Sequence, residues 1–240
     1  MKTSLLILAL LGGVVVVDTA LADPVSGQGT WESTLQARDI GGDNTVDAYY
    51  DTVLDITWLV DSKAAQGSIY DDGLFANDGY VTWASAMAWV ASLNVYGTSG
   101  WRLPTAHNRD GSGLCFGNYC PESEMGHLYN VTLGNADRLL NTGPFLNQFG
   151  GGHWTSTDGE LDSPPGVLPR TASTAWRFSF SEGRQSRATK VGALGAWAVR
   201  DGDILAASVP VPEPGTLALV VAAMLGAAAT RRRGPAAPTA

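Results

Sequence analysis

The sequence predicts an α+β domain in which short strands and two helices are joined by many turns. Its 240 residues include 29 glycines and 12 prolines, which is typical of a turn-rich fold rather than a helical bundle. Runs of β-branched and aromatic residues are short, and helical spacing of apolar residues occurs in only two places. Eight tryptophans supply large rings for a core between such short elements.

Two segments carry helix signals. Thr82 can cap a helix over residues 83–93, and Ser123 can cap a second, short helix that runs through Leu128. The large apolar residues that recur at helical spacing in the first helix are Trp83, Met87 and Val90. Ala86 and Trp89 lie beside them in the same helix.

Extended segments are expected on both sides of the helices. Residues 49–59 read as a strand or a pair of strands, and residues 101–105 as a short extended piece that ends at a proline. Three later strands are expected at 153–157, 175–180 and 195–200, with a turn at 181–184.

The middle of the chain is acidic. Removing Lys2 and the three arginines at 231–233 takes the bases from 15 to 11, and removing Asp18 takes the acids from 23 to 22, so the middle carries 11 − 22 = −11. Such a body repels phosphate backbones, which argues against nucleic acid as a partner.

Residues 1–22 have the pattern of a secretory signal peptide. Lys2 precedes an apolar stretch, and the small residues Ala20 and Ala22 form a cleavage site before Asp23. The Sec machinery and signal peptidase are therefore the expected partners of this segment. An uncleaved anchor helix is the alternative, although the apolar stretch is short for a membrane span.

The C-terminus has three parts in a fixed order. A proline-rich tether over 204–214 ends in Pro212, Glu213 and Pro214, and an apolar membrane segment with an arginine cluster covers 215–233. The cluster consists of Arg231, Arg232 and Arg233, and a short tail over 234–240 follows it. Arginines at this end favour a topology with the domain outside the cytoplasm.

This arrangement resembles the PEP-CTERM sorting signal. In that family an exosortase, a membrane cysteine protease, recognises and removes the tail of proteins exported by Gram-negative bacteria that make exopolysaccharide. The resemblance implies exosortase as a partner and the cell surface or the extracellular matrix as the destination. A simple membrane anchor that is never cut is the alternative.

The globular part, residues 23–203, is similar to the Lcl C-terminal domain family. The segments that carry the similarity are 48–59, 101–105, 123–128, 141–145, 153–157, 175–178 and 198–200. The resemblance implies a C-type-lectin-like fold, with two helices on small, mostly antiparallel sheets, and a non-enzymatic binding domain for which polysaccharide is a candidate ligand. A hydrolytic or modifying enzyme of envelope polysaccharides and a purely structural surface protein are the alternatives.

Cys115 and Cys120 are the only cysteines, and in an exported protein they are expected to form a disulfide. Closing so short a loop stabilises by about 2 kcal/mol in the chain-entropy account. A zinc site built from both cysteines with His107 and His127 is the alternative, although these spacings match no standard zinc finger.

Two acidic stretches are candidates for weak calcium binding. The first covers 39–47, and the second contains Asp71, Asp72, Asn77 and Asp78. Neither fits the EF-hand template, so solvated turns are the simpler interpretation and no cofactor is assigned.

No standard catalytic motif occurs, so the domain is expected not to be an enzyme. Asp158 and Glu160 are close in sequence, but only their separation in space would indicate a glycosidase pair. His153 is expected to pack in the core.

The candidate ligand site is a basic strand–turn–strand unit. Five bases gather within about 20 residues: Arg170, Arg177, Arg184, Arg187 and Lys190. Alternate strand positions share a face, so Arg177 and Arg187 are expected in one patch, with Trp154 as a sugar-stacking ring. A solvated hairpin rim and a core tryptophan are the alternatives.

Overall fold

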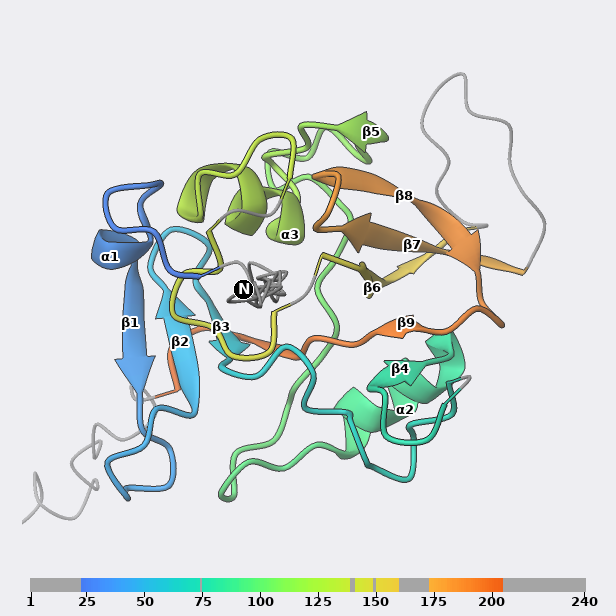
Figure 1. The fold of residues 1–240 in the computed structure, drawn as a ribbon, viewed down its shortest axis with the longest axis horizontal. Coiled ribbons are helices and arrows are strands. Elements are labelled where there is room, and N and C mark those ends of the chain that lie inside the picture. The colour runs from blue at the N-terminus through green and yellow to red at the C-terminus, as the bar shows by residue number, and fades with distance from the viewer. Residues whose placement is uncertain (1–22, 74, 139–140, 149, 160–172, 205–240) are drawn as a thin grey trace, which may run out of the picture.

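The computed structural model describes residues 23–73, 75–138, 141–148, 150–159 and 173–204. It confirms the α+β class, with short helices and two small sheets (Figure 1). The predicted signal peptide, most of the tether, the membrane segment and the arginine cluster lie outside the described residues.

The first sheet is antiparallel and lies on the left of Figure 1. Its strands, in spatial order, are β1 (Leu35–Arg38), β2 (Ala48–Asp51), β3 (Ile56–Leu59) and β10 (Val199–Asp201). The segment predicted as a strand or a pair of strands is the β2–β3 hairpin. Its turn is closed by Asp51, whose carboxylate accepts bonds from the amides of Val53 and Leu54, both at 3.0 Å.

The second sheet is larger and occupies the right of Figure 1. Its order is β4 (Tyr80–Val81), β9 (Leu194–Gly195), β6 (Gly152–Asp158), β7 (Thr174–Ser179), β8 (Arg184–Thr189) and β5 (Gly117–Asn118). All its pairings are antiparallel except that of β6 with β9.

The strand predicted at 195–200 is divided between the two sheets. β9 pairs with β4 and β6 in the second sheet, whereas β10 pairs with β3 in the first. The intervening residues 196–198 are fully buried and cross from one sheet to the other. A local pattern shows an extended, buried run but not that its two ends join different sheets.

The two predicted helices are present with their caps. In α2 (Trp83–Ser92) the Thr82 side chain accepts a bond from the amide of Ser85, and in α3 (Glu124–His127) Ser123 accepts one from Gly126. α3 continues as the π-helical turn η1 (Leu128–Thr132). The buried face of α2 consists of Ala86, Trp89 and Val90, while Trp83 and Met87 are half-buried and pack at its edge.

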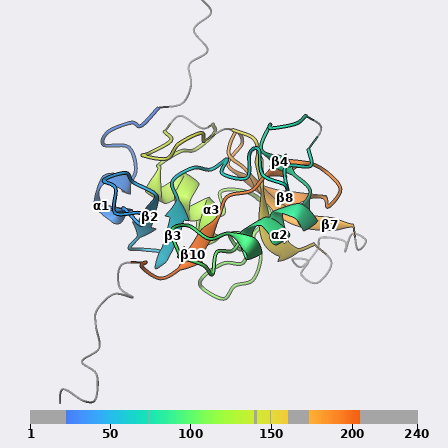
Figure 2. The ribbon, with the colours of Figure 1, turned by 90° about the horizontal axis from the view of Figure 1, so that it is seen from below.

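A one-turn helix, α1 (Trp31–Thr34), was not predicted. It follows a backbone crossing in which a Cβ on Gly29 would lie 2.3 Å from the carbonyl oxygen of Thr132. Glycine is therefore required there, and the crossing docks the N-terminal segment on η1. Seen from below, β2, β3 and β10 lie beside one another on one side, and α2 and β7 on the other (Figure 2).

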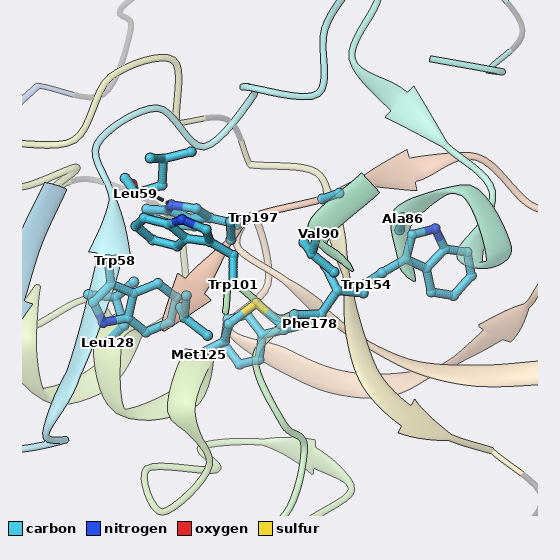
Figure 3. Close-up of a cluster of buried hydrophobic side chains, with 14 of the residues drawn as sticks. Trp58, Leu59, Ala86, Val90, Trp101, Met125, Leu128, Trp154, Phe178 and Trp197 are labelled. Atoms are coloured by element: carbon cyan, nitrogen blue, oxygen red, sulfur yellow. Dashed lines mark hydrogen bonds between the residues drawn. The ribbon is translucent and has the colours of Figure 1, made fainter. Parts of the chain in front are cut away.

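The core lies between the sheets and is dominated by aromatic rings (Figure 3). Trp197, in the crossing segment, has its ring centroid 5.1 Å from that of Trp58 and 4.9 Å from that of Phe145. Its indole nitrogen donates to the carbonyl of Leu59 at 2.8 Å. The ring therefore stays fully buried without leaving its polar atom unsatisfied.

His153 packs in this core, as predicted. Its ring lies 5.1 Å from that of Phe180 and 6.0 Å from that of Trp197, and none of the residue is exposed. Burial lowers the pKa of His153 to about 3, because a charged imidazolium cannot be solvated there.

An ion cluster joins α3 to the first sheet. The Arg102 guanidinium donates to Glu124 at 2.7 and 2.9 Å and also contacts Asp201 on β10. Burial lowers the pKa of Arg102, but the bonds to Glu124 and Asp201 outweigh it and raise the pKa. Glu124 is 8% exposed in its side chain and also accepts from the amide of Thr105. Removing it would leave a half-buried cation and a backbone amide without their acceptor.

We predict that Glu124→Ala lowers the free energy of unfolding by about 2 kcal/mol, discounted from the deeply buried case because Arg102 is partly exposed. Glu122→Ala, an exposed change two residues earlier, should cost less than about 0.5 kcal/mol. Urea denaturation of both variants measures this. Equal losses for the two would contradict the structural role of the cluster.

We predict an acid-dependent loss of stability from His153. Its folded pKa is below the ordinary 6.5, so the unfolded chain takes up the proton first. The contribution of His153 to the free energy of unfolding is fully present above pH 6.5. It decreases as the pH falls toward 3, by up to about 1.4 kcal/mol per pH unit. Relative to His153→Phe, the native protein should lose about 2–3 kcal/mol more between pH 6.5 and 4.5 in denaturant titrations. A constant difference between the two proteins would show that His153 does not contribute.

Candidate functional site

The two predicted patch arginines lie on opposite faces of the second sheet. In the β7–β8 register Arg177 is opposite Ser186, whereas Arg187 is opposite Trp176. Cross-strand partners share a face, so Arg177 and Arg187 cannot form one patch. The prediction is wrong because the turn at 180–183 sets a register that the alternation along one strand cannot show.

Trp154 is a core residue rather than a surface ring. It has no exposed area, and its indole nitrogen donates to the carbonyl of Val81 at 2.8 Å. In Figure 3 it lies toward Val90 and Ala86 of α2. Neither ring face is open to a sugar, so the stacking role is wrong for this residue and the packing alternative holds.

The predicted disulfide between Cys115 and Cys120 is present. It closes a loop of residues 115–120, here called the disulfide loop, at the edge of the second sheet. Gly117 and Asn118 in this loop form β5 and pair with Gln185 and Arg184 of β8. The buried Gln185 side chain also donates to the carbonyl of Cys115 at 2.8 Å and to that of Ala106 at 2.9 Å. The loop is therefore held on a regular strand.

Two aromatic side chains of the disulfide loop reach solvent. Phe116 is 42% exposed and Tyr119 is 72% exposed. The Phe116 ring packs edge-on against buried Trp176, with centroids 6.0 Å apart. Large rings on a covalently closed loop lose little freedom when a ligand binds.

A cation lies beside one of these rings. The Arg184 guanidinium lies 5.8 Å from the centroid of Phe116, within cation–π range. Arg184 is exposed, and within the described part of the chain its guanidinium makes no ion pair or hydrogen bond. All five of its N–H donors are therefore available to a ligand.

Phe116, Tyr119 and Arg184 together are called the loop surface. Aromatic faces pack against the C–H faces of sugar rings, and a guanidinium donates hydrogen bonds to hydroxyl or carboxylate oxygens. The loop surface can thus hold a polyhydroxylated polymer by contact and hydrogen bonding. It contains no nucleophile paired with a base.

The zinc alternative is excluded by the disulfide, because both sulfur atoms are bonded to each other. His127 directs its Nδ1 to the carbonyl of Pro121 at 3.2 Å, and burial lowers its pKa. Among the residues with described positions, no group of three or more His, Cys, Asp or Glu is arranged to hold a metal ion.

The acidic stretches serve as turn and cap acceptors. The Asp39 carboxylate accepts from the amides of Gly42, Asp43 and Asn44, and Asp72 accepts from Thr82 and Ser85 at the start of α2. The Asp39 carboxylate thus accepts from backbone amides of its own turn, and Asp72 accepts from the amide and hydroxyl of Thr82 and the hydroxyl of Ser85, which fits the interpretation as turns.

Of the two carboxylates considered as a glycosidase pair, only Asp158 belongs to the residues that the structure describes. Asp158 accepts from the Lys190 ammonium at 2.7 Å, while Glu160 lies outside the described residues. Lys190 also lies 4.5 Å from the Trp83 ring centroid. Asp158 therefore holds the end of β6 to the end of β8.

The bases expected from the sequence include Arg184, whereas Phe116 and Tyr119 are found only in the structure. A signal was present, because two aromatic residues stand between cysteines only five positions apart. Aromatic residues in so short a closed loop cannot all turn inward, and at least one is expected at the surface.

In the part of the chain with described coordinates, no helix has the length and apolar character needed to cross a membrane. No curated protein matches the chain at a significant level. Residues 210–233 match the family model of the PEP-CTERM protein-sorting motif. Residues 210–233 thus carry the signal of an exported protein that passes through a membrane-anchored intermediate, has exosortase as its processing partner and is directed in general terms to the cell surface.

Proposed function

We propose that the domain is a non-enzymatic polysaccharide-binding module of the cell surface or the exopolysaccharide matrix, with the loop surface as its contact. The observation that carries the proposal is a covalently closed loop with two exposed aromatic side chains, one of which lies beside the available guanidinium of Arg184. The sorting motif supports it, because it directs the domain to the cell surface, where an envelope polysaccharide would be within reach.

We further propose that this domain has a C-type-lectin-like fold. Two small sheets, two capped helices and a large share of irregular loop are compatible with a C-type-lectin-like domain of the Lcl C-terminal family. The calcium-coordinating tripeptides of calcium-dependent lectins are missing from the sequence. Ligand contact through aromatic rings requires no calcium ion.

Removing a ring from the loop surface should weaken binding about tenfold, corresponding to about 1.4 kcal/mol. We predict this for Tyr119→Ala and for Phe116→Ala, measured as retention of the full-length, detergent-purified protein on immobilised alginate and dextran. Arg184→Gln should weaken binding to alginate, a uronic-acid polymer, more than binding to dextran, a neutral glucan, because it removes a cation.

Matched controls are available on the same molecule. Tyr96 is 65% exposed and has a positive φ of 47°, compared with 72% and 59° for Tyr119. Phe75 is 73% exposed. Tyr96→Ala and Phe75→Ala should leave binding unchanged, and a loss as large as that of the loop variants would contradict the assignment of the site.

The sorting motif makes a separate prediction. Replacing Arg231, Arg232 and Arg233 together with Gln should leave the C-terminal tail attached, because the charges that hold this end in the cytoplasm are lost. Intact-mass analysis of the envelope fraction from a host that carries an exosortase measures tail removal. The corresponding triple Lys variant keeps the charge and should retain the inside orientation. Normal processing of the Gln variant would contradict the role of the charge.

A further inference from the structure

The disulfide loop is weakly held apart from its disulfide. Its interior pairs with β8 through Gly117 and Asn118 only, and strands of about two residues have little stability of their own. Within the described residues, no other backbone hydrogen bond anchors positions 116–119. Most of Tyr119 is in solvent, so its burial adds little, and Phe116 contributes one edge-on contact with Trp176.

The loop also contains two residues in the left-handed backbone region. Gly117 has φ 113° and Tyr119 has φ 59°. For glycine this conformation is ordinary, but a bulky aromatic residue stays there only when the surrounding structure imposes it. Tyr119 is next to Cys120, so the disulfide acts directly on the more exposed of the two aromatic residues in the loop.

The rest of the domain is anchored without the disulfide. On one side, Gln185 holds the carbonyl of Cys115 from within the sheet. On the other side, the carbonyl of Cys120 accepts from the amide and hydroxyl of Ser123, the cap of α3. The aromatic core around Trp197 lies between the two sheets and does not include the disulfide loop.

We infer that oxidation of Cys115 and Cys120 switches the loop surface into its binding geometry, while the domain folds in either redox state. In the oxidation the two thiols lose two electrons and two protons, which a thiol–disulfide exchange partner of the envelope accepts as its own disulfide becomes a dithiol. Since this happens outside the cytoplasm, the loop surface becomes competent only after export. The inference rests on the proposed polysaccharide-binding function and concerns how that same site is controlled.

The test compares the oxidised full-length protein with its reduced form and with a Cys115→Ser, Cys120→Ser double variant. Circular dichroism checks the fold, amide hydrogen exchange reports on Gly117 and Asn118, and retention on alginate and dextran reports binding. In the reduced and variant proteins we expect unchanged circular dichroism spectra. Amide exchange at Gly117 and Asn118 should be at least about tenfold faster, and binding should be about tenfold weaker. Reductant should have no further effect on the double variant, which serves as the control for its side effects.

Equal exchange and equal binding in the oxidised and reduced proteins would overturn the inference while leaving the proposed function intact. An unfolded double variant and an unfolded reduced protein would also overturn it, because the switch requires a folded domain. If the oxidised protein binds neither polysaccharide, the proposed function fails. The exchange rates then decide on the switch alone: faster exchange after reduction supports it, and equal exchange overturns it.

Discussion

The packing of Trp197 between two sheets is the interaction on which the rest of the domain depends. Its ring contacts Trp58 from the first sheet and His153 from the second, and its nitrogen is bonded to Leu59. The chain on either side supplies β9 to one sheet and β10 to the other. A change at this position would therefore loosen both sheets together, because neither has enough residues to form a core alone.

The site is an appendage to this rigid centre. β7 and β8 are paired over six residues, and β8 presents Arg184 and Gln185 to the disulfide loop. The loop adds the exposed rings, and the Cys115–Cys120 disulfide closes the loop on this frame. This separation is common in proteins in which a scaffold carries stability and a loop carries recognition. It also explains why redox control of the loop is compatible with a stable domain.

Electrostatics divides the charged residues into structural and available groups. Three cations each pair with a carboxylate at a nitrogen–oxygen distance of 2.7 Å, namely Arg38, Arg102 and Lys190. These pairs hold together segments that are distant in the sequence. Arg184 has no such partner among the described residues. An overall acidic domain thus exposes the Arg184 cation beside the Phe116 ring, which favours a specific local contact over general attraction to polyanions.

Local chemistry in the chain was sufficient for several features. Thr82 and Ser123 cap helices because a hydroxyl satisfies free amides at a helix start, and the cysteines pair because export places them in an oxidising compartment. The sorting motif is likewise recognised from the order of its parts. Each of these depends on residues that are close together in the sequence.

Contacts between segments distant in the sequence decide the features that the sequence alone did not predict. The β7–β8 register places Arg177 and Arg187 on opposite faces of the sheet. Trp154 is buried, and it lies toward α2, which shields it from solvent. A register is set by a turn and by the core on both sides of a sheet, so a one-residue shift would invert every assignment of a face. The crossing at Trp197 arises in the same way, because it depends on which distant strands lie beside β9 and β10.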